Sequence, residues 1–346
     1  MSVLTFHPYQ LKLSKPYRWA KGVQTHRTGF VVRMAHEGVV GWGEAALLPH
    51  IVHDPHKFAH QCELLVDGLN ALDGDFLAQL DQRECPPALR CGISSAYLSH
   101  QAAARGQRFA EFLAATGPVE DTVRVNALVT EVTPAQCVQA TRDHVAAGIH
   151  TIKLKCGKDR RADLARVEAI RNAFPALKLR IDPNQSWDED WAADHLRDFR
   201  PFDLQYCEEP LAPGTPFDSY RRLRELGGVP IALDESIVDR ASAELAIDRG
   251  AADYFVLKLQ RLGGPDRLLD VAGLARSRQV PTVLTSSMET TIGLAVGLHA
   301  AALVQAPGLD AGLATSSFFA ENLAPALPVV EGCMALPPGP GLGVSL

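Results

Sequence analysis

The sequence predicts an α/β protein: a parallel (β/α) barrel preceded by a smaller α+β domain. From about Val123 onward, short apolar runs typical of strands alternate seven times with longer amphipathic segments typical of helices. Before that point, strand-like runs come first and helix-like runs follow, which is the order found in α+β domains. A third observation, the even spacing of five charged residues, indicates what the barrel does.

The N-terminal part reads as a meander followed by helices. Apolar and polar residues alternate over 4–13 and 29–35, and a third strand is expected over 38–45, where we take the glycines to mark turns. Residues 56–116 are helical in character. The prediction for this part is therefore a small antiparallel sheet with helices packed on it.

Seven strand–helix units follow. Strands are expected at 123–129, 150–155, 177–182, 204–208, 230–234, 254–258 and 281–286, each followed by a helix, and a last strand near 308–313. Each unit takes roughly 25–30 residues, the usual length of a strand with its return helix. Such units form parallel strands with right-handed crossovers and close into a barrel. An open doubly wound sheet is the alternative, but no glycine-rich fingerprint follows the first strand.

Composition narrows the function classes. The net charge is −6 and basic residues form no run, which argues against a nucleic-acid partner. We see no secretory signal and no apolar run long enough to span a membrane, and the seven cysteines include no CxxC pair. A cytoplasmic protein with reduced thiols is expected. The sequence leaves the oligomeric state open, and a homo-oligomer is consistent with it.

Five charged residues lie at nearly equal intervals along the repeat: Lys155, Asp182, Glu208, Asp234 and Lys258 are 27, 26, 26 and 24 residues apart. Each stands at the end of an expected strand. Because the carboxyl ends of parallel strands meet at one rim of a barrel, we expect the five side chains to lie together. Side-chain alternation should point them into the barrel, where charges must pair or bind a metal.

The residue types indicate the chemistry. Three carboxylates with no cysteine or histidine beside them are hard oxygen donors, which favour Mg²⁺ and also suit Mn²⁺. A lysine with its ordinary pKa near 10.4 is protonated at neutral pH, so Lys155 needs neighbouring cations, such as Lys153, to act as a base. Together they predict removal of a proton next to the carboxylate of a small-molecule substrate, with the metal stabilising the enediolate. A histidine group at 50, 53, 56 and 60 is interrupted by prolines, and we do not expect zinc there.

These residues resemble the enolase superfamily, in its muconate-lactonising subgroup. The motifs are KLK at 153–155, DPN at 182–184, EEP at 208–210, DES at 234–236 and LK at 257–258. The resemblance implies a modified (β/α)7β barrel of the TIM type over residues 119–320. It also implies a capping α+β domain of residues 1–118, which the C-terminal segment 321–346 completes. By position, Asp182, Glu208 and Asp234 would bind Mg²⁺, and Glu209 would not.

Within that subgroup the sequence most resembles the o-succinylbenzoate synthases of menaquinone biosynthesis. This likeness implies a lyase that forms o-succinylbenzoate from a cyclohexadiene hydroxy-acid by α-proton abstraction and loss of water. Lys155 would remove the proton and then protonate the departing hydroxyl, and Lys258 would stabilise the enolate through a cation–π contact. The expected substrate-binding residues are Lys153, Arg180, Asn184, Ser286 and Ser287, with Trp19, Lys21 and His26 as candidates from a cap loop.

Several alternatives stay open at this point. Arg180 could instead pair with an acid, Asn184 could serve a turn or helix N-cap, and the serines could cap a helix near Glu289. An N-succinylamino acid racemase shares nearly all these residues and would use both lysines as bases. Dipeptide epimerases carry Asp-x-Asp near the last strand, whereas Asp310 stands alone here. A non-catalytic barrel that binds a metabolite is the hypothesis from another class.

Overall fold

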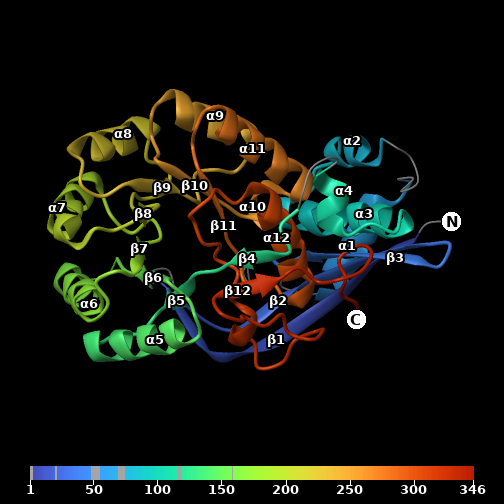
Figure 1. The fold of residues 1–346 in the computed structure, drawn as a ribbon. Coiled ribbons are helices and arrows are strands. Elements are labelled where there is room, and N and C mark those ends of the chain that lie inside the picture. The colour runs from blue at the N-terminus through green and yellow to red at the C-terminus, as the bar shows by residue number, and fades with distance from the viewer. Residues whose placement is uncertain (1–2, 20–21, 48–54, 69–74, 115–118, 158) are drawn as a thin grey trace.

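The structure is a computed structural model that describes residues 3–19, 22–47, 55–68, 75–114, 119–157 and 159–346. An antiparallel sheet with helices on one side lies against a parallel barrel surrounded by helices (Figure 1). The α/β class predicted from the sequence is confirmed. Within the described residues, no helix has the length and apolar character needed to cross a bilayer. None of the seven cysteines, all of them described, forms a disulfide.

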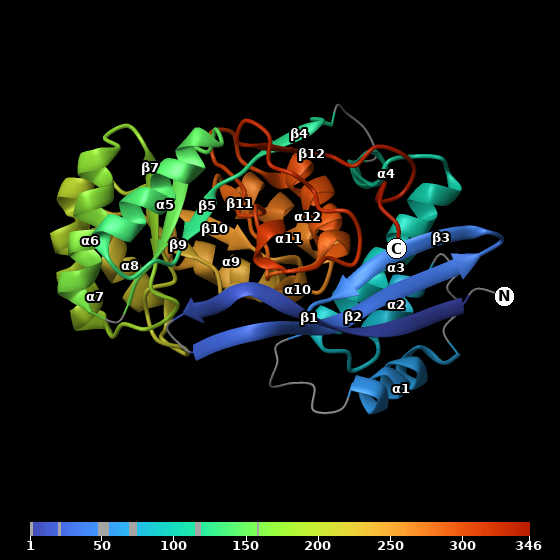
Figure 2. The ribbon, with the colours of Figure 1, turned by 90° about the horizontal axis from the view of Figure 1, so that it is seen from below.

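The N-terminal sheet is the predicted meander, with order β1-β2-β3. Its strands are β1 (Val3–Trp19), β2 (Gly22–His36) and β3 (Val39–Ala45), and its helices are α1 (Pro55–Val66), α2 (Phe76–Asp81), α3 (Pro87–Ala104) and α4 (Phe109–Ala114). The long β1–β2 ribbon runs beneath the barrel toward its helices (Figure 2). It carries the end of β1 to the mouth of the barrel, next to the residues described below.

The glycines of β3 differ from the sequence interpretation. Gly38 does occupy the turn before β3, with φ 79°, but Gly41 and Gly43 lie inside the strand. A Cβ atom on Gly43 would lie 2.0 Å from the carbonyl oxygen of Gly92 in α3. These glycines therefore let helix α3 pack directly on the strand, which is a reason for glycine that a turn pattern does not reveal.

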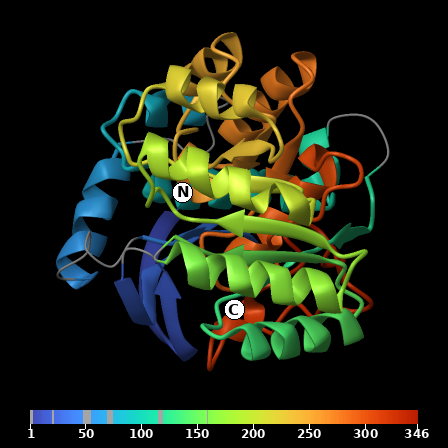
Figure 3. The same ribbon diagram turned by 90° about the vertical axis from the view of Figure 1, so that its left-hand side faces the viewer.

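The barrel contains seven parallel strands in the order β5 to β11. The strands are β5 (Ala127–Val129), β6 (Thr151–Lys155), β7 (Lys178–Asp182), β8 (Tyr206–Glu208), β9 (Ile231–Leu233), β10 (Tyr254–Leu257) and β11 (Thr282–Leu284). The return helices are α5 (Pro134–Ala146), α6 (Arg160–Ala173), α7 (Glu189–Phe199), α8 (Phe217–Leu226), α9 (Arg240–Asp248), α11 (Pro265–Ser277) and α12 (Thr291–Val304), with a short α10 (Leu259–Leu262). Figure 3 shows several of these helices, green to yellow, stacked along the outside of the strands.

The last predicted strand closes the barrel as a short bridge. Ala311 exchanges backbone hydrogen bonds with Arg124 and Asn126, beside β4 (Thr122–Arg124) and β5, at 2.8–2.9 Å. Gly312 does the same with Leu284 and Ser286 at the end of β11, at 2.9 Å. No return helix follows this bridge in the described residues. Instead, the chain runs as a short 3-10 turn (Ser316–Phe318) and coil to β12 (Cys333–Ala335), which pairs with β4.

Local sequence explains where the barrel helices begin. Thr133 and Gln136 form a capping box at the start of α5, and Asp159, Asp188 and Asp239 accept backbone N–H bonds at the first turns of α6, α7 and α9. These side chains satisfy amide groups that a helix leaves unpaired at its N-terminus. The helix starts are thus fixed by residues next to the rim where the charged strand ends lie.

Side chains in the barrel strands alternate as predicted. Ile152, Leu154, Leu179 and Ile181 are fully buried in the large apolar cluster shared with the helices. A separate small cluster, Tyr206, Ala232, Val256 and Val283, consists of one residue from each of four strands. Their positions have the parity of the charged strand ends, so they form the layer of the barrel interior below those charges.

The cap and the barrel are joined by buried polar contacts. The Glu44 carboxylate on β3 accepts bonds from the Thr290 backbone N–H and hydroxyl and from the Gly293 N–H, at 2.6–3.1 Å, all at the start of α12. It also accepts one from the Tyr9 hydroxyl at 2.6 Å. Arg27 on β2 donates to the carbonyl oxygens of Ser287 and Met288. The loop before α12 is therefore held by two strands of the cap.

Candidate active site

The structure brings the five evenly spaced residues to one rim of the barrel. Lys155, Asp182 and Glu208 are the last residues of β6, β7 and β8, and Asp234 and Lys258 directly follow β9 and β10. Lys155 and Asp182 are register partners in the β6–β7 pair. All three acids are fully buried. The five residues thus lie together at the rim, as their equal spacing predicted, and the burial of the acids requires that positive charge lie beside them.

Two lysines of β6 supply part of that charge. The Lys153 ammonium bridges Glu208 Oε1 at 2.7 Å and Asp182 Oδ2 at 2.9 Å. The Lys155 ammonium lies 2.7 Å from Asp182 Oδ2 and 2.5 Å from Asn184 Oδ1. Because Lys153 and Lys155 are two residues apart on one strand, both point into the barrel.

Asp234 is neutralised from the other side of the site. It forms ion pairs with Lys258 and with Arg261, which lies on α10 immediately after β10. The short helix α10 turns the chain so that a residue three positions after Lys258 also faces Asp234.

Burial and the neighbouring cations act against each other on the pKa values of the three acids, and the outcome differs between them. Burial raises the pKa of Asp182, but Lys153 and Lys155 outweigh it and hold that pKa below its ordinary value. Burial also raises the pKa of Asp234, but Arg261 and Lys258 outweigh it and hold that pKa below its ordinary value. Burial raises the pKa of Glu208 to about 8, despite the attraction of Lys153. Burial also opposes the charge of Lys155, yet Asp182 raises its pKa above the ordinary lysine value.

The donor set agrees in chemistry with a divalent cation. Three buried carboxylates provide the hard oxygen atoms that Mg²⁺ prefers. The Lys153 ammonium already bridges two of them, and Glu208 Oε2 is buried without a hydrogen-bond partner. In the part of the chain that is described, no three His, Cys, Asp or Glu side chains are close enough together to hold one ion. Joint metal binding by Asp182, Glu208 and Asp234 stays a prediction, and it requires the lysines to yield these oxygen atoms.

Glu209 is occupied by structural contacts, although it neighbours Glu208. Its φ of 40° turns the side chain out of the strand alternation. Its carboxylate accepts hydrogen bonds from the backbone N–H groups of Asp234 and Ser236, and from the hydroxyls of Ser236 and Tyr220. These bonds fix the loop that carries Asp234, which gives Glu209 a role in positioning that loop.

Arg180 lies deeper than the acids. It is fully buried and donates to the side chains of Gln205 and Asn126 and to the Asp310 carbonyl oxygen, at 2.7–2.9 Å. Its guanidinium carbon lies 4.8 Å from the centre of the Tyr206 ring. Within the described residues, Asp182 and Glu208 form their ion pairs with lysines and not with Arg180. Asn184, with φ 50°, sits at the rim between Lys155 and Glu235.

Ser286 and Ser287 follow β11 at the mouth of the barrel. The Ser286 hydroxyl donates to Glu289 Oε2 at 2.5 Å, and the Ser287 N–H donates to the same oxygen at 2.7 Å. Thr315 in turn donates to the Ser286 hydroxyl at 3.1 Å. The serines therefore organise the turn before α12 together with Glu289 and do not cap that helix, whose N-cap residue is Thr290. Ser286 also faces the cavity described next.

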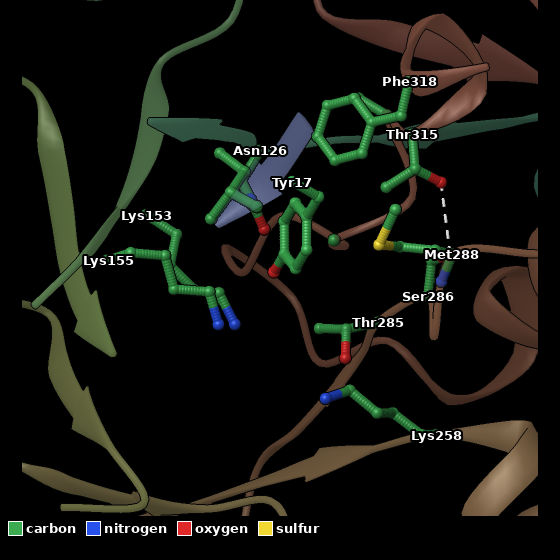
Figure 4. Close-up of a pocket in the computed structure, with 13 residues that line it drawn as sticks. Tyr17, Asn126, Lys153, Lys155, Lys258, Thr285, Ser286, Met288, Thr315 and Phe318 are labelled. Atoms are coloured by element: carbon green, nitrogen blue, oxygen red, sulfur yellow. Dashed lines mark hydrogen bonds between the residues drawn. The ribbon is translucent and has the colours of Figure 1, made fainter. Parts of the chain in front are cut away.

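A cavity opens at this rim, and lysines approach it from two sides. In Figure 4, Lys153 and Lys155 point into it from one side and Lys258 from the other, with their nitrogen atoms directed toward the centre. Asn126, Thr285 and Ser286 line it as well, and Tyr17 and Phe318 lie at its other end. Cationic groups on opposite sides of a small cavity can hold an anionic molecule between them.

Some lining residues escaped the sequence analysis. Tyr17 comes from β1 of the cap and Phe318 from the 3-10 turn after the barrel, so neither belongs to a strand-end motif. Proximity in sequence to the candidate Trp19 was the one available signal for Tyr17. The side chain of Trp19, and Lys21, lie outside the described residues, and His26 is exposed. His50 and His53 and the side chain of His56 also lie outside them, and His60 lies 3.7 Å from Glu63.

Comparisons with known proteins agree with this architecture. A family model described as enolase C-terminal domain-like matches residues 136–346. The chain is 41% identical over 203 residues to an o-succinylbenzoate synthase of Thermobifida fusca, covering 57% of this chain and 61% of that relative. It is 29% identical over 357 residues to an N-succinylamino acid racemase of Thermus thermophilus, covering 97% and 92%.

A solved structure extends the likeness over the whole chain. The dipeptide epimerase of Enterococcus faecalis, complexed with Mg and a dipeptide, matches with a TM-score of 0.89 over 99% of both chains, at 22% identity. At that identity the likeness concerns the fold. The capping sheet and the barrel are thus arranged here as they are in that protein.

Proposed function

Because this chain belongs to the enolase superfamily, we propose that it is a Mg²⁺-dependent lyase that forms o-succinylbenzoate from a cyclohexadiene hydroxy-acid in menaquinone biosynthesis. The observation that carries the proposal is the pair of lysines at 155 and 258, which reach one cavity from opposite sides with three buried acids beside them. The likeness to the Thermobifida relative, which covers part of each chain, supports the choice of substrate.

Asp182, Glu208 and Asp234 would hold the Mg²⁺ ion, or Mn²⁺ in its place. When bound, the ion supplies a Lewis acid for the substrate carboxylate and for the negative charge that develops there. Three carboxylates supply this site with more negative charge than the ion carries, and Lys153 and Arg261 lie beside them to offset the excess.

We propose the same division of the chain into domains as the sequence suggested: residues 1–118 with 321–346 as cap, and 119–320 as barrel.

Lys155 would remove the α-proton and later return a proton to the departing hydroxyl. In the described arrangement its ammonium is paired with Asp182, which keeps it protonated. If Asp182 were a ligand of the Mg²⁺ ion, Lys155 would lose its acidic partner and would still have the Lys153 ammonium nearby. Both effects would lower the pKa of Lys155. Lys258, on the other side of the cavity, would stabilise the electron-rich ring face through a cation–π contact. Loss of hydroxide needs the proton that Lys155 holds, so one amine serves both steps.

The remaining residues would bind and orient the substrate. Ser286 offers a hydroxyl at the cavity, and Asn184 positions Lys155 through its 2.5 Å contact. For Lys153 we propose a charge-balancing role at the substrate carboxylate. Arg180 acts from below by holding Asn126, which lines the cavity, and Ser287 acts through the turn that presents Ser286.

The test is an activity assay on the purified chain. The cyclohexadiene substrate is incubated with and without EDTA, and aromatisation is followed by ultraviolet absorbance. We expect conversion that EDTA abolishes and that added Mg²⁺ restores. A protein that folds and binds Mg²⁺ but leaves the spectrum unchanged would refute the proposed lyase.

Racemisation of N-succinylamino acids is the second candidate, because the Thermus relative matches 97% of this chain. In that reaction Lys155 and Lys258 would act as two bases on opposite faces of the α-carbon. Proton NMR in D₂O separates the two activities. Incorporation of deuterium at the α-position of both enantiomers supports racemisation, and unchanged α-proton signals exclude it for the amino acids tested.

A further inference from the structure

We propose that the active-site cavity continues into a second, mostly apolar cavity, and that Phe318 separates the two and limits the length of the ligand. The second cavity adjoins the first, because Leu128, Ala314 and Phe318 line both. His144, Asn322 and Leu327 line the second cavity alone. This inference rests on the proposed function only in assuming that the first cavity binds a carboxylate.

The fold explains why a second cavity exists at this place. Seven barrel strands are each followed by a helix, but the bridge at Ala311 and Gly312 is followed by a short turn and coil. That coil, red in Figure 1, passes beside β5 and α5, where an eighth helix would otherwise pack. A regular helix fills the groove between neighbours with interlocking side chains, whereas this irregular segment leaves space against α5.

Phe318 is suited to be a movable partition. It ends the 3-10 turn, and its half-buried ring is 6.2 Å from the ring of Tyr17, which is a loose contact. Figure 4 shows the ring standing at the end of the active-site cavity, opposite the lysines. A phenylalanine side chain has no hydrogen bond to break, so only apolar contacts hold it in place.

The lining defines the ligand chemistry. Most of the second cavity is apolar, formed by residues such as Ile149 and Leu327. Asn322 donates to the Ser316 carbonyl oxygen at 3.3 Å, while its own Oδ1 is buried and has no hydrogen-bond partner. The cavity therefore fits the apolar arm of a carboxylate ligand, and an N–H or O–H on that arm would pair with Asn322.

Binding of a graded series of ligands tests this inference. N-acetyl- and N-hexanoyl-phenylglycine are titrated calorimetrically into the full chain with Mg²⁺. For the unchanged protein we expect the longer chain to bind no more than about twofold tighter. For Phe318→Ala we expect N-hexanoyl-phenylglycine to bind about tenfold tighter than N-acetyl-phenylglycine, because its added methylenes become buried. Phe318→Leu, a milder change, should give a smaller gain if the alanine variant is unstable.

Two variants of Leu327 locate the bound chain. Leu327→Ala enlarges the second cavity without opening the partition, so it should bind the series as the unchanged protein does. Adding Leu327→Trp to Phe318→Ala fills the second cavity and should remove the gain. A gain that survives Leu327→Trp, no gain in Phe318→Ala, or no binding of either ligand to any variant would each overturn the inference. Binding as expected without conversion of the cyclohexadiene substrate would instead refute the proposed lyase alone.

Discussion

Two regions of this molecule bury carboxylates, and they do so in opposite ways. At the joint between cap and barrel, Glu44 is surrounded by four N–H and O–H donors of the protein. At the barrel rim, Asp182, Glu208 and Asp234 are held by lysine and arginine side chains, and Glu208 Oε2 has no partner. A carboxylate saturated by fixed donors has nothing left to bind, whereas one paired with lysines can exchange them for another cation.

The comparison suggests how buried charge can be used. In both regions burial raises the pKa of a glutamate, Glu44 at the joint and Glu208 at the rim. The joint compensates this cost with hydrogen bonds that also cap α12, so the carboxylate contributes to stability. The rim leaves part of the cost uncompensated, which is typical of sites that bind a ligand or metal.

The largest expected effect concerns the rim. Lys155→Ala should lower kcat roughly 10²–10⁴-fold, because it removes the proposed acid and base while leaving the fold intact. Steady-state kinetics with the cyclohexadiene substrate measures this. Lys178→Ala is the matched control, since Lys178 is an exposed residue at the opposite end of β7 that donates to the Gly308 carbonyl. Full activity in the Lys155 variant would remove this lysine from the mechanism.

Two adjacent glutamates sharpen the comparison. Glu208→Gln should reduce Mg²⁺ binding and activity by roughly 10²-fold or more with little change in stability. Glu209→Gln should lower stability by about 1–3 kcal/mol, because an amide N–H₂ would face N–H and O–H donors. Mg²⁺ titration and steady-state kinetics of both variants measure the first effect, and thermal unfolding of both variants measures the second. If the two exchanged these phenotypes, the assignment of Glu208 as ligand would be wrong.

A substitution at the joint between cap and barrel should lower the stability of the protein. Glu44→Ala leaves the Tyr9 hydroxyl, the Thr290 amide and the Gly293 amide unpaired, and we expect a loss of about 3 kcal/mol in the free energy of unfolding. Chemical denaturation measures the loss. Glu37→Ala, an exposed residue at the start of the β2–β3 turn, provides the control. An unchanged unfolding midpoint in Glu44→Ala would show that the joint does not depend on this carboxylate.

The smallest effect depends on pH. Burial lowers the pKa of His299, on α12, to about 4, and its ring accepts from the Ala110 N–H and pairs with the Leu342 carbonyl as a neutral imidazole. Between about pH 6.5, its unfolded pKa, and about pH 4, His299 is protonated in the unfolded chain but neutral in the folded chain. Stability should therefore fall by on the order of 1–3 kcal/mol as pH drops from 6.5 to about 4.

Denaturant titrations between pH 7 and 4 check this effect, and His299→Gln should flatten the dependence. A dependence of the same size in His299→Gln would assign it to other groups. His195 has to be considered alongside, because burial lowers its pKa as well.

Some residues of the site could be predicted from the sequence and others could not, for a physical reason. Strand and helix periodicity repeated seven times, so the barrel, its inward-facing positions and the five rim residues could be read from local pattern. The positions of Tyr17, Phe318 and Arg261 could not, since these residues reach the rim from a cap strand, a 3-10 turn and a short helix that follow no repeat. The glycines of β3 were assigned to turns because their contact with α3 is not local.

The sequence alone determined which side chains share the barrel rim, because strand-end position and side-chain parity follow from backbone geometry. Only the tertiary structure decided which acid is paired with which cation and where the cavity ends. The ion pairs join side chains of different strands and loops, and the cavity ends where Tyr17 and Phe318, from distant parts of the sequence, lie side by side. Local pattern carries no information about such contacts, because packing and electrostatics act through distance in space.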